Sequence, residues 1–421
     1  MQPTDDARAD AGSRPPARVE PRADARAIAW QALRAVEDGR ADRLGDLIAA
    51  NGATDEDLGL ARELAFGVAR HHRLYDFLAD PFLRPGDQPP DLRRVLRLGA
   101  HQLFALDRVP PHAAVHATIE TLKQCGSPRL AGVANAVLRR LSEMRLAERS
   151  GDGPEGRLPP EALPDDPAVR HSLPPLLVAD ALASDPPGGA AALAALNRLP
   201  HLCTRTRPGR PRPNGTGILR QDGAWTWWSD PRAALAGPVA SGDAVVQDRA
   251  QGELVDLAAP RPGDLILDCC AAPGGKALAF IDRGCRVVAA DLSPVRLRAM
   301  TLPAPTMAMD GCRPAVVPAF DLVVVDAPCS NSGVLARRPE ARWRYDREHL
   351  ADLGRLQRDL LGAATTRVIP GGRLIYATCS IAQRENQAVA HGLHGWRILA
   401  ERCSWPDEWR AGGYAAVLVR A

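Results

Sequence analysis

Two cysteines occupy matching positions in the second half of the chain. Cys329 comes shortly after the apolar stretch 322–325, and Cys379 comes shortly after the apolar stretch 374–376. Both stretches are typical of buried strands, and parallel strands deliver the residues that follow them to one edge of a sheet. A lone cysteine most often packs in a core. Two thiols at one sheet edge instead indicate nucleophilic catalysis, in which a thiolate bonds covalently to the substrate.

A loop of small residues lies upstream of both cysteines. The segment LILDCCAAPGGK, residues 265–276, combines an apolar strand with a tight turn and the start of a helix. Gly274 and Gly275 let the backbone approach a ligand closely. Lys276 is notable because it is one of only two lysines among 53 basic residues. The loop lacks the spacing GxGxxG, which disfavours a nicotinamide-dependent dehydrogenase.

Acidic residues end two further apolar stretches, and each has two interpretations. Asp291 can bind the hydroxyl groups of a ribose, or it can cap the helix that begins after Ser293. Asp310 can contact the edge of an adenine, or it can form the turn before Gly311. The residues by themselves leave both alternatives open.

The elements that position these residues follow a regular order. From residue 241 to residue 421, short apolar strands alternate with helices, and the longest helix is expected at 347–368. This alternation predicts an α/β fold with a mostly parallel sheet and helices on both faces. The strands of this sheet are expected at residues 265–267, 287–290, 306–309, 322–325 and 374–376.

The first part of the chain has a different pattern. Residues 1–23 are polar and lack periodicity, so they are predicted to be a disordered tail. Residues 24–148 carry apolar side chains at spacings of three and four, with proline and glycine between the runs. That pattern is typical of amphipathic helices and predicts a compact all-helical domain.

Residues 149–240 are predicted to hold a linker and a small subdomain that contacts RNA. Six arginines and no acidic residue fall within 198–220. They can meet a phosphate backbone, or they can belong to a solvated loop, and the two interpretations weigh about equally. Trp225, Trp227 and Trp228 follow in a strand-like stretch. They can stack on bases, but packing in a core or at a sheet edge is the favoured interpretation.

Composition excludes several classes of protein. The chain has 421 residues, of which 45% are hydrophobic and 24% are charged, and its net charge is +3. These values are ordinary for globular proteins, and the low net charge excludes a uniformly basic nucleic-acid binder. No apolar run approaches the roughly 18 residues of a membrane span. The polar N-terminus predicts a cytoplasmic protein without a secretory signal. Nine cysteines without zinc-ligand spacing predict reduced thiols and no metal site.

Four segments together resemble a known family. CAAPGGK at 270–276, DAPCSNSG at 326–333 and YATCSI at 376–381 resemble the motifs of RNA cytosine-C5 methyltransferases that use S-adenosylmethionine. The helical part resembles the NusB-like RNA-binding domain, with the segment ANAVLRR at 134–140. The combination is similar to the RsmB/Sun (Fmu) family of ribosomal RNA methyltransferases. The resemblance implies a Rossmann-like methyltransferase domain with a seven-stranded sheet.

The resemblance also implies roles for individual residues. It assigns Cys379 as the nucleophile that adds to C6 of cytosine, Cys329 as the group that serves product release, and Asp326 as a contact of the cytosine edge. In related DNA enzymes the cysteine after proline attacks, so the opposite assignment of the two thiols stays open. The implied S-adenosylmethionine site consists of Cys270, Ala271, Ala272, Pro273, Gly274, Gly275, Lys276, Asp291, Asp310 and Asp326.

The implied substrate is the 16S RNA of the small ribosomal subunit, bound by a monomeric enzyme. A transfer RNA substrate is the first alternative. An inactive RNA-binding or ribosome assembly factor is the second, and the presence of Cys379, Cys329 and Lys276 disfavours it. Arg296 matches a family position near the cofactor, although it can equally be an ordinary exposed arginine on a helix. Arg338, Pro339 and Trp343 match a segment that is expected to shape the wall on the RNA side.

Overall fold

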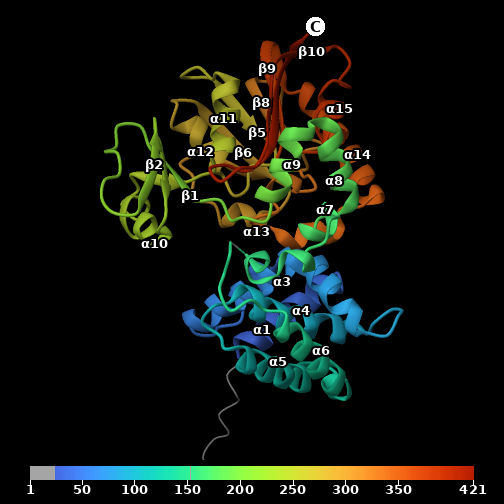
Figure 1. The fold of residues 1–421 in the computed structure, drawn as a ribbon. Coiled ribbons are helices and arrows are strands. Elements are labelled where there is room, and N and C mark those ends of the chain that lie inside the picture. Colours follow the sequence, from blue (N-terminus) through green and yellow to red (C-terminus); the bar gives the residue numbers. More distant parts are fainter. Residues whose placement is uncertain (1–23, 152) are drawn as a thin grey trace, which may run out of the picture.

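The computed structural model describes residues 24–151 and 153–421. The predicted disordered tail, residues 1–23, lies outside the described residues. Figure 1 shows a helical unit formed by the first part of the chain and a sheet-containing unit formed by the second part. A small separate sheet lies to one side of the larger one (Figure 1).

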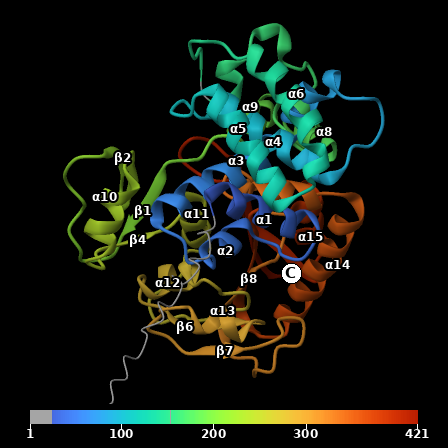
Figure 2. The ribbon, with the colours of Figure 1, turned by 90° about the horizontal axis from the view of Figure 1, so that it is seen from below.

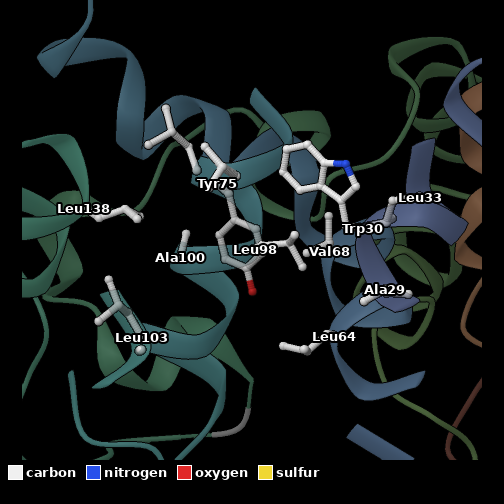
Figure 3. Close-up of a cluster of buried hydrophobic side chains, with 14 of the residues drawn as sticks. Ala29, Trp30, Leu33, Leu64, Val68, Tyr75, Leu98, Ala100, Leu103 and Leu138 are labelled. Carbon is white, nitrogen blue, oxygen red and sulfur yellow. The ribbon is translucent and has the colours of Figure 1, made fainter. Parts of the chain in front are cut away.

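Amphipathic helices build the helical unit, as their spacing predicts. Its core surrounds Trp30 of the first helix and Tyr75 of the third, and Figure 3 shows these two side chains among aliphatic neighbours such as Leu98. The Thr54 hydroxyl caps the third helix by accepting a hydrogen bond from the Asp57 N–H. The elements are α1 (Ala25–Glu37), α2 (Leu44–Ala49), α3 (Asp55–Ala79), η1 (Asp80–Phe82), α4 (Pro90–Ala105), α5 (Pro111–Cys125), η2 (Pro128–Leu130) and α6 (Ala131–Glu143).

The segment that follows packs against both units. Arg157 is buried and donates hydrogen bonds to Asp107 at 2.7 Å and to the carbonyl of Leu146 at 3.2 Å, which ties this segment to the helical unit. Leu177 instead packs in a cluster with Leu335 of the second unit. The elements of this segment are η3 (Pro154–Arg157), η4 (Pro160–Ala162), α7 (Pro167–Arg170), α8 (Pro175–Ser184) and α9 (Pro186–Ala195).

The small sheet is antiparallel and has the strand order β2-β3-β1-β4. Trp225, Trp227 and Trp228 on β3 are at most 5% exposed, which confirms packing rather than base stacking. The elements are β1 (Leu202–Thr206), β2 (Ile218–Asp222), β3 (Trp225–Trp228), α10 (Pro231–Ala234), the π-helical turn η5 (Leu235–Val239) and β4 (Ala244–Val246).

The row of arginines in 198–220 is not a row of unpaired charges. Arg205 and Arg207 both form ion pairs with the buried Asp282, at 2.7 and 2.9 Å. The sequence does not indicate these two ion pairs, because it shows no acidic neighbour while the fold supplies one from a distant helix end. Arg220 lies over the rings of Trp227 and Trp409.

The large sheet confirms the predicted parallel arrangement. Its order is β10-β11-β9-β8-β5-β6-β7, and β7, β6, β5, β8 and β9 run parallel, whereas β11 is antiparallel to both of its neighbours. The strands are β5 (Leu265–Asp268), β6 (Arg286–Asp291), β7 (Thr306–Ala308), β8 (Phe320–Asp326), β9 (Val368–Thr378), β10 (Trp396–Ser404) and β11 (Gly413–Arg420).

Apolar clusters cover both faces of this sheet. Phe280 belongs to the cluster on one face and Leu361 to the cluster on the other. The helix expected at 347–368 ends at Thr365, because Val368 already belongs to β9. The remaining elements are α11 (Arg249–Ala258), α12 (Gly275–Ile281), α13 (Pro294–Arg298), η6 (Ser332–Val334), η7 (Pro339–Arg344), α14 (Arg347–Thr365), η8 (Gln383–Glu385) and α15 (Gln387–Ala390). Within residues 24–151 and 153–421, no helix is long and apolar enough to cross a membrane.

Buried arginine contacts join the two units. The Arg342 guanidinium donates to the carbonyl oxygens of Arg70, Ser172 and Leu196, and burial lowers its pKa to about 9. The Trp343 ring packs edge-on against His72 of α3. Trp343 thus contacts the helical unit, and its expected place in a wall on the RNA side stays a prediction.

Candidate active site

A cavity of about 550 Å³ opens at the carboxyl ends of β5, β6, β8 and β9. Such a volume is in the range of sites for small organic ligands. Most of the residues singled out in the sequence line this cavity, whereas Ala271, Gly274 and Gly275 do not. The lining residues from that set are Cys270, Ala272, Pro273, Lys276, Asp291, Asp310, Asp326, Cys329 and Cys379.

The glycine-containing loop connects β5 to α12 along one side of the cavity. Gly274 has a φ of +100°, a left-handed conformation that explains the need for glycine at this position. The Ala271 N–H donates to the carbonyl of Ala290 at 2.8 Å and fixes the loop to β6. Lys276 is then directed across the cavity, where its ammonium group donates a hydrogen bond to the Asp326 carboxylate.

The two predicted thiols meet in this cavity. The Sγ atoms of Cys329 and Cys379 lie 3.2 Å apart, and the Cys379 Sγ lies 3.4 Å from the Asn331 Oδ1. The N–H of Gly333 donates to the Cys379 carbonyl at 2.9 Å. A Cβ at position 333 would lie 2.8 Å from the same oxygen, so glycine is required for the two loops to approach each other.

The surroundings of the two thiols differ in charge. A hydrogen bond from Cys329 lowers the pKa of Cys379, and the charges of Lys276 and Arg338 lower it further, against the opposing effects of burial and Asp326. The pKa of Cys329 is raised by the hydrogen bond to Cys379 and by burial, with Glu385 adding to the effect. The cations lie on the Cys379 side, so Cys379 is the thiol that this site favours as a thiolate.

This asymmetry predicts the effect of removing the lysine. In Lys276→Met, a positive charge near Cys379 is lost and Asp326 is left unpaired, so the pKa of Cys379 rises. The thiolate fraction at neutral pH then falls, by about tenfold for each pKa unit. We expect slower alkylation of Cys379 by iodoacetamide, with the pH–rate profile displaced to higher pH, when the labelled peptide is quantified by mass spectrometry.

A matched control is available for this prediction. Lys123, the other lysine, lies on α5 and pairs with Glu120 at 2.7 Å in an exposed position. Lys123→Met is expected to leave the alkylation profile of Cys379 unchanged. A profile of Lys276→Met that coincides with that of the wild type would contradict the assigned role of this charge.

A buried polar network holds the two cysteine loops together. Glu385 is 0% exposed, and its carboxylate accepts hydrogen bonds from the Ser330 N–H at 2.8 Å and from the Ser380 hydroxyl at 2.6 Å. Gln357 of α14 donates to the same carboxylate at 3.1 Å and to the Pro328 carbonyl at 2.9 Å. Sequence reasoning missed this network, because the only signal was an acidic residue shortly after the Cys379 motif.

The binding of ribose hydroxyls by Asp291 stays a prediction, and the cap of α13 is Ser293, whose hydroxyl accepts a hydrogen bond from the Arg296 N–H. The Asp291 carboxylate lines the cavity, and it also accepts hydrogen bonds from the Ser293 N–H at 2.9 Å and the Ala272 N–H at 3.2 Å. Arg296 pairs with it at 2.9 Å while keeping an exposed side chain. Asp310 likewise lines the cavity and accepts a hydrogen bond from the Cys312 N–H in its turn.

Asp268 at the end of β5 is a further acidic group of this region. Burial raises its pKa to about 7, and the nearby charge of Asp326 adds to the effect. Neither carboxylate oxygen has a hydrogen-bond partner among the residues that the structure describes.

Strand-end carboxylates at Asp291 and Asp310 offer acceptors for ribose hydroxyls and an exocyclic amine, so the residues present fit a nucleoside cofactor.

Comparisons with known proteins agree with this site. The family described as 16S rRNA methyltransferase RsmB/F matches residues 255–397, and the NusB family matches residues 23–143. A relative from Salmonella arizonae, named ribosomal RNA small subunit methyltransferase B, is 32% identical over 79% of this chain and 81% of its own length. The chain belongs to the RsmB/F methyltransferase family. As a methyltransferase of this family, the chain uses S-adenosylmethionine as its cofactor.

Other proteins are also similar to this RsmB/F chain over most of its length. A putative methyltransferase of Mycobacterium tuberculosis is 37% identical over 85% of this chain and 83% of its own length. The crystal structure of the protein PH0851 superimposes with a TM-score of 0.71 at 18% identity and covers 95% of this chain and 99% of its own. That likeness shows that the whole arrangement of helical and sheet-containing units is shared. Among the described residues, no group of three or more side chains suited to a metal ion is present.

Proposed function

We propose that this RsmB/F chain transfers a methyl group from S-adenosylmethionine to C5 of a cytosine in small-subunit ribosomal RNA. The observation that carries the proposal is the pair of thiols, 3.2 Å apart, beside the Lys276–Asp326 pair in one cavity. Methylation of a nitrogen or oxygen needs no thiol, whereas methylation of C5 needs a nucleophile at C6.

The reaction follows from the chemistry of cytosine. C5 is a poor nucleophile until the Cys379 thiolate adds to C6, which forms an S–C6 bond and makes C5 enamine-like. Bound S-adenosylmethionine supplies an electrophilic methyl group, which C5 attacks while the sulfonium leaves as a thioether. A base then takes the proton from C5, the electron pair of that C–H bond restores the C5–C6 double bond, and the Cys379 thiolate is expelled.

The remaining residues support this sequence of steps. We propose that Asp326 accepts a hydrogen bond from the exocyclic amine of cytosine and steadies the ring as charge develops. Lys276, which Asp326 holds near Cys379, favours the thiolate. We propose that Cys329 serves product release, because it lies within hydrogen-bond distance of the sulfur that must leave. The target base must be turned out of its stack to enter the cavity.

The substrate assignment rests on the relatives. The names of the Salmonella arizonae and Vibrio cholerae relatives refer to the small-subunit ribosomal RNA, and both match about four-fifths of this chain. Four properties stay predictions. They are the cytoplasmic location, the monomeric state, the residue ranges of the domains and the role of residues 149–240 in RNA contact.

A methyl-transfer assay tests the proposed function. Radiolabelled S-adenosylmethionine is supplied with small-subunit ribosomal RNA, large-subunit ribosomal RNA or transfer RNA from a strain that lacks this gene. We expect label only in 5-methylcytidine from the small-subunit RNA. Label in transfer RNA would overturn the substrate and keep the chemistry. Absence of label, together with absence of cofactor binding, would favour an RNA-binding factor without activity.

A further inference from the structure

One arginine of the helical unit reaches the cavity of the other unit. Arg43, immediately before α2, lines the cavity together with strand-end residues that lie more than 200 positions away in the sequence. The adjacent Asp42 pairs with Arg344 of η7, which anchors the turn between α1 and α2 to the second unit. Figure 2 shows α2 on the side of the helical unit that faces α11 and α13.

Arg43 stands beside two other arginines of the cavity wall. Arg296 and Arg338 also line it. The Arg43 side chain is exposed at the mouth of the cavity. Partial burial lowers its pKa, and the charges of Arg338 and Arg296 lower it further. Arg296 is neutralised by Asp291. Within the described part of the chain, Arg43 and Arg338 form no ion pair within 4.0 Å, although Asp46 and Glu340 attract Arg43 from farther away.

Arg338 connects this group to the reacting centre. Its guanidinium donates to the Asn331 Oδ1 at 3.3 Å, and the same oxygen lies 3.4 Å from the Cys379 Sγ. An anion held between Arg338 and Arg43 would therefore lie near the base that Cys379 attacks. Two neighbouring cations repel each other, and a shared anion removes that cost.

We propose that Arg43 and Arg338 together bind a backbone phosphate next to the target cytidine, so that the helical unit completes the RNA site of the methyltransferase. The inference rests on the proposed function, since it takes RNA as the substrate. A guanidinium matches the oxygens of a phosphate with two parallel hydrogen bonds. The methionine carboxylate of the cofactor offers similar chemistry, and the experiment below separates the two anions.

The test compares Arg43→Ala with Arg40→Ala in the full chain. Arg40 lies in the same turn, is exposed and pairs with Asp38, and it does not line the cavity. We expect Arg43→Ala to raise the KM for small-subunit RNA by about tenfold, the value of one charge-assisted contact. The KM for S-adenosylmethionine is expected to stay unchanged. Arg43→Lys, which keeps the charge, is expected to restore part of the affinity.

A binding measurement is independent of the methylation assay. The affinity for a fluorescent single-stranded, cytidine-rich RNA is measured by anisotropy at several salt concentrations. Loss of one phosphate contact should reduce the slope of log affinity against log salt by about 0.7. This reduction is expected for Arg43→Ala and not for Arg40→Ala, even if small-subunit RNA proves to be the wrong substrate.

Three results would overturn the inference. Equal effects of Arg43→Ala and Arg40→Ala would indicate a nonspecific effect of surface charge and no particular phosphate contact at Arg43. A raised KM for S-adenosylmethionine with unchanged RNA binding would assign Arg43 to the cofactor carboxylate. An unchanged salt slope for Arg43→Ala would show that no phosphate is bound there.

Discussion

Cys329→Ala is expected to accumulate a covalent protein–RNA adduct, whereas Cys379→Ala is expected to form none and to lose methyl transfer completely. The reason is that Cys379 makes the bond to C6 and Cys329 is needed for its release. The adduct is measured as a band of reduced mobility after denaturing electrophoresis of enzyme, small-subunit RNA and S-adenosylmethionine. The loss of the nucleophile removes the covalent route itself, which makes this the largest effect on turnover that we expect.

Cofactor binding serves as the control for both cysteine variants. Each is expected to bind S-adenosylmethionine like the wild type, because truncation of a thiol removes neither Asp291 nor the glycine-containing loop. An adduct in Cys379→Ala and none in Cys329→Ala would reverse the roles of the two thiols. That outcome would correspond to the assignment known from related DNA enzymes, and it would contradict the charge asymmetry around the thiols.

Glu385→Ala is expected to destabilise the methyltransferase unit by about 3 kcal/mol or more. The substitution leaves the buried Ser330 N–H without its acceptor and removes the carboxylate to which the Ser330 and Ser380 hydroxyls donate, and each such loss costs about 1–3 kcal/mol. The free energy of unfolding is measured by urea denaturation. Methyl transfer is measured well below the unfolding midpoint, where we also expect a loss, because the network fixes the distance between Cys329 and Cys379.

Two further variants sharpen this prediction. Glu385→Gln keeps one acceptor oxygen and places an amide near hydroxyl groups that can rotate, so an intermediate loss of stability is expected. Glu348→Ala, an exposed substitution in the first turn of α14, should change stability very little. If Glu385→Ala were as stable as the wild type, the buried network would not be holding the cysteine loops.

The local features of the methyltransferase unit could be predicted from the amino-acid sequence. The strand–loop–helix at 265–276 follows from apolar residues, glycine at a left-handed position and a helix start, all of which depend on neighbours in sequence. The parallel sheet follows from the alternation of strands and helices. The meeting of Cys329 and Cys379 at one edge was predictable for the same reason, because parallel strands end together.

The distant side chains that complete the site could not be predicted in this way, because the packing of whole elements brings them together. Asp282 neutralises Arg205, Trp343 packs on the helical unit, Glu385 receives donors from two loops, and Arg43 enters from another unit. None of these contacts leaves a periodic or spacing signal, because each joins residues whose separation along the chain is set by the packing of whole elements. The 3.2 Å between the thiols is of this kind as well. This distance depends on the buried carboxylate of Glu385 and on Gly333, which lets the two cysteine loops approach each other. The order of residues along the chain does not fix it.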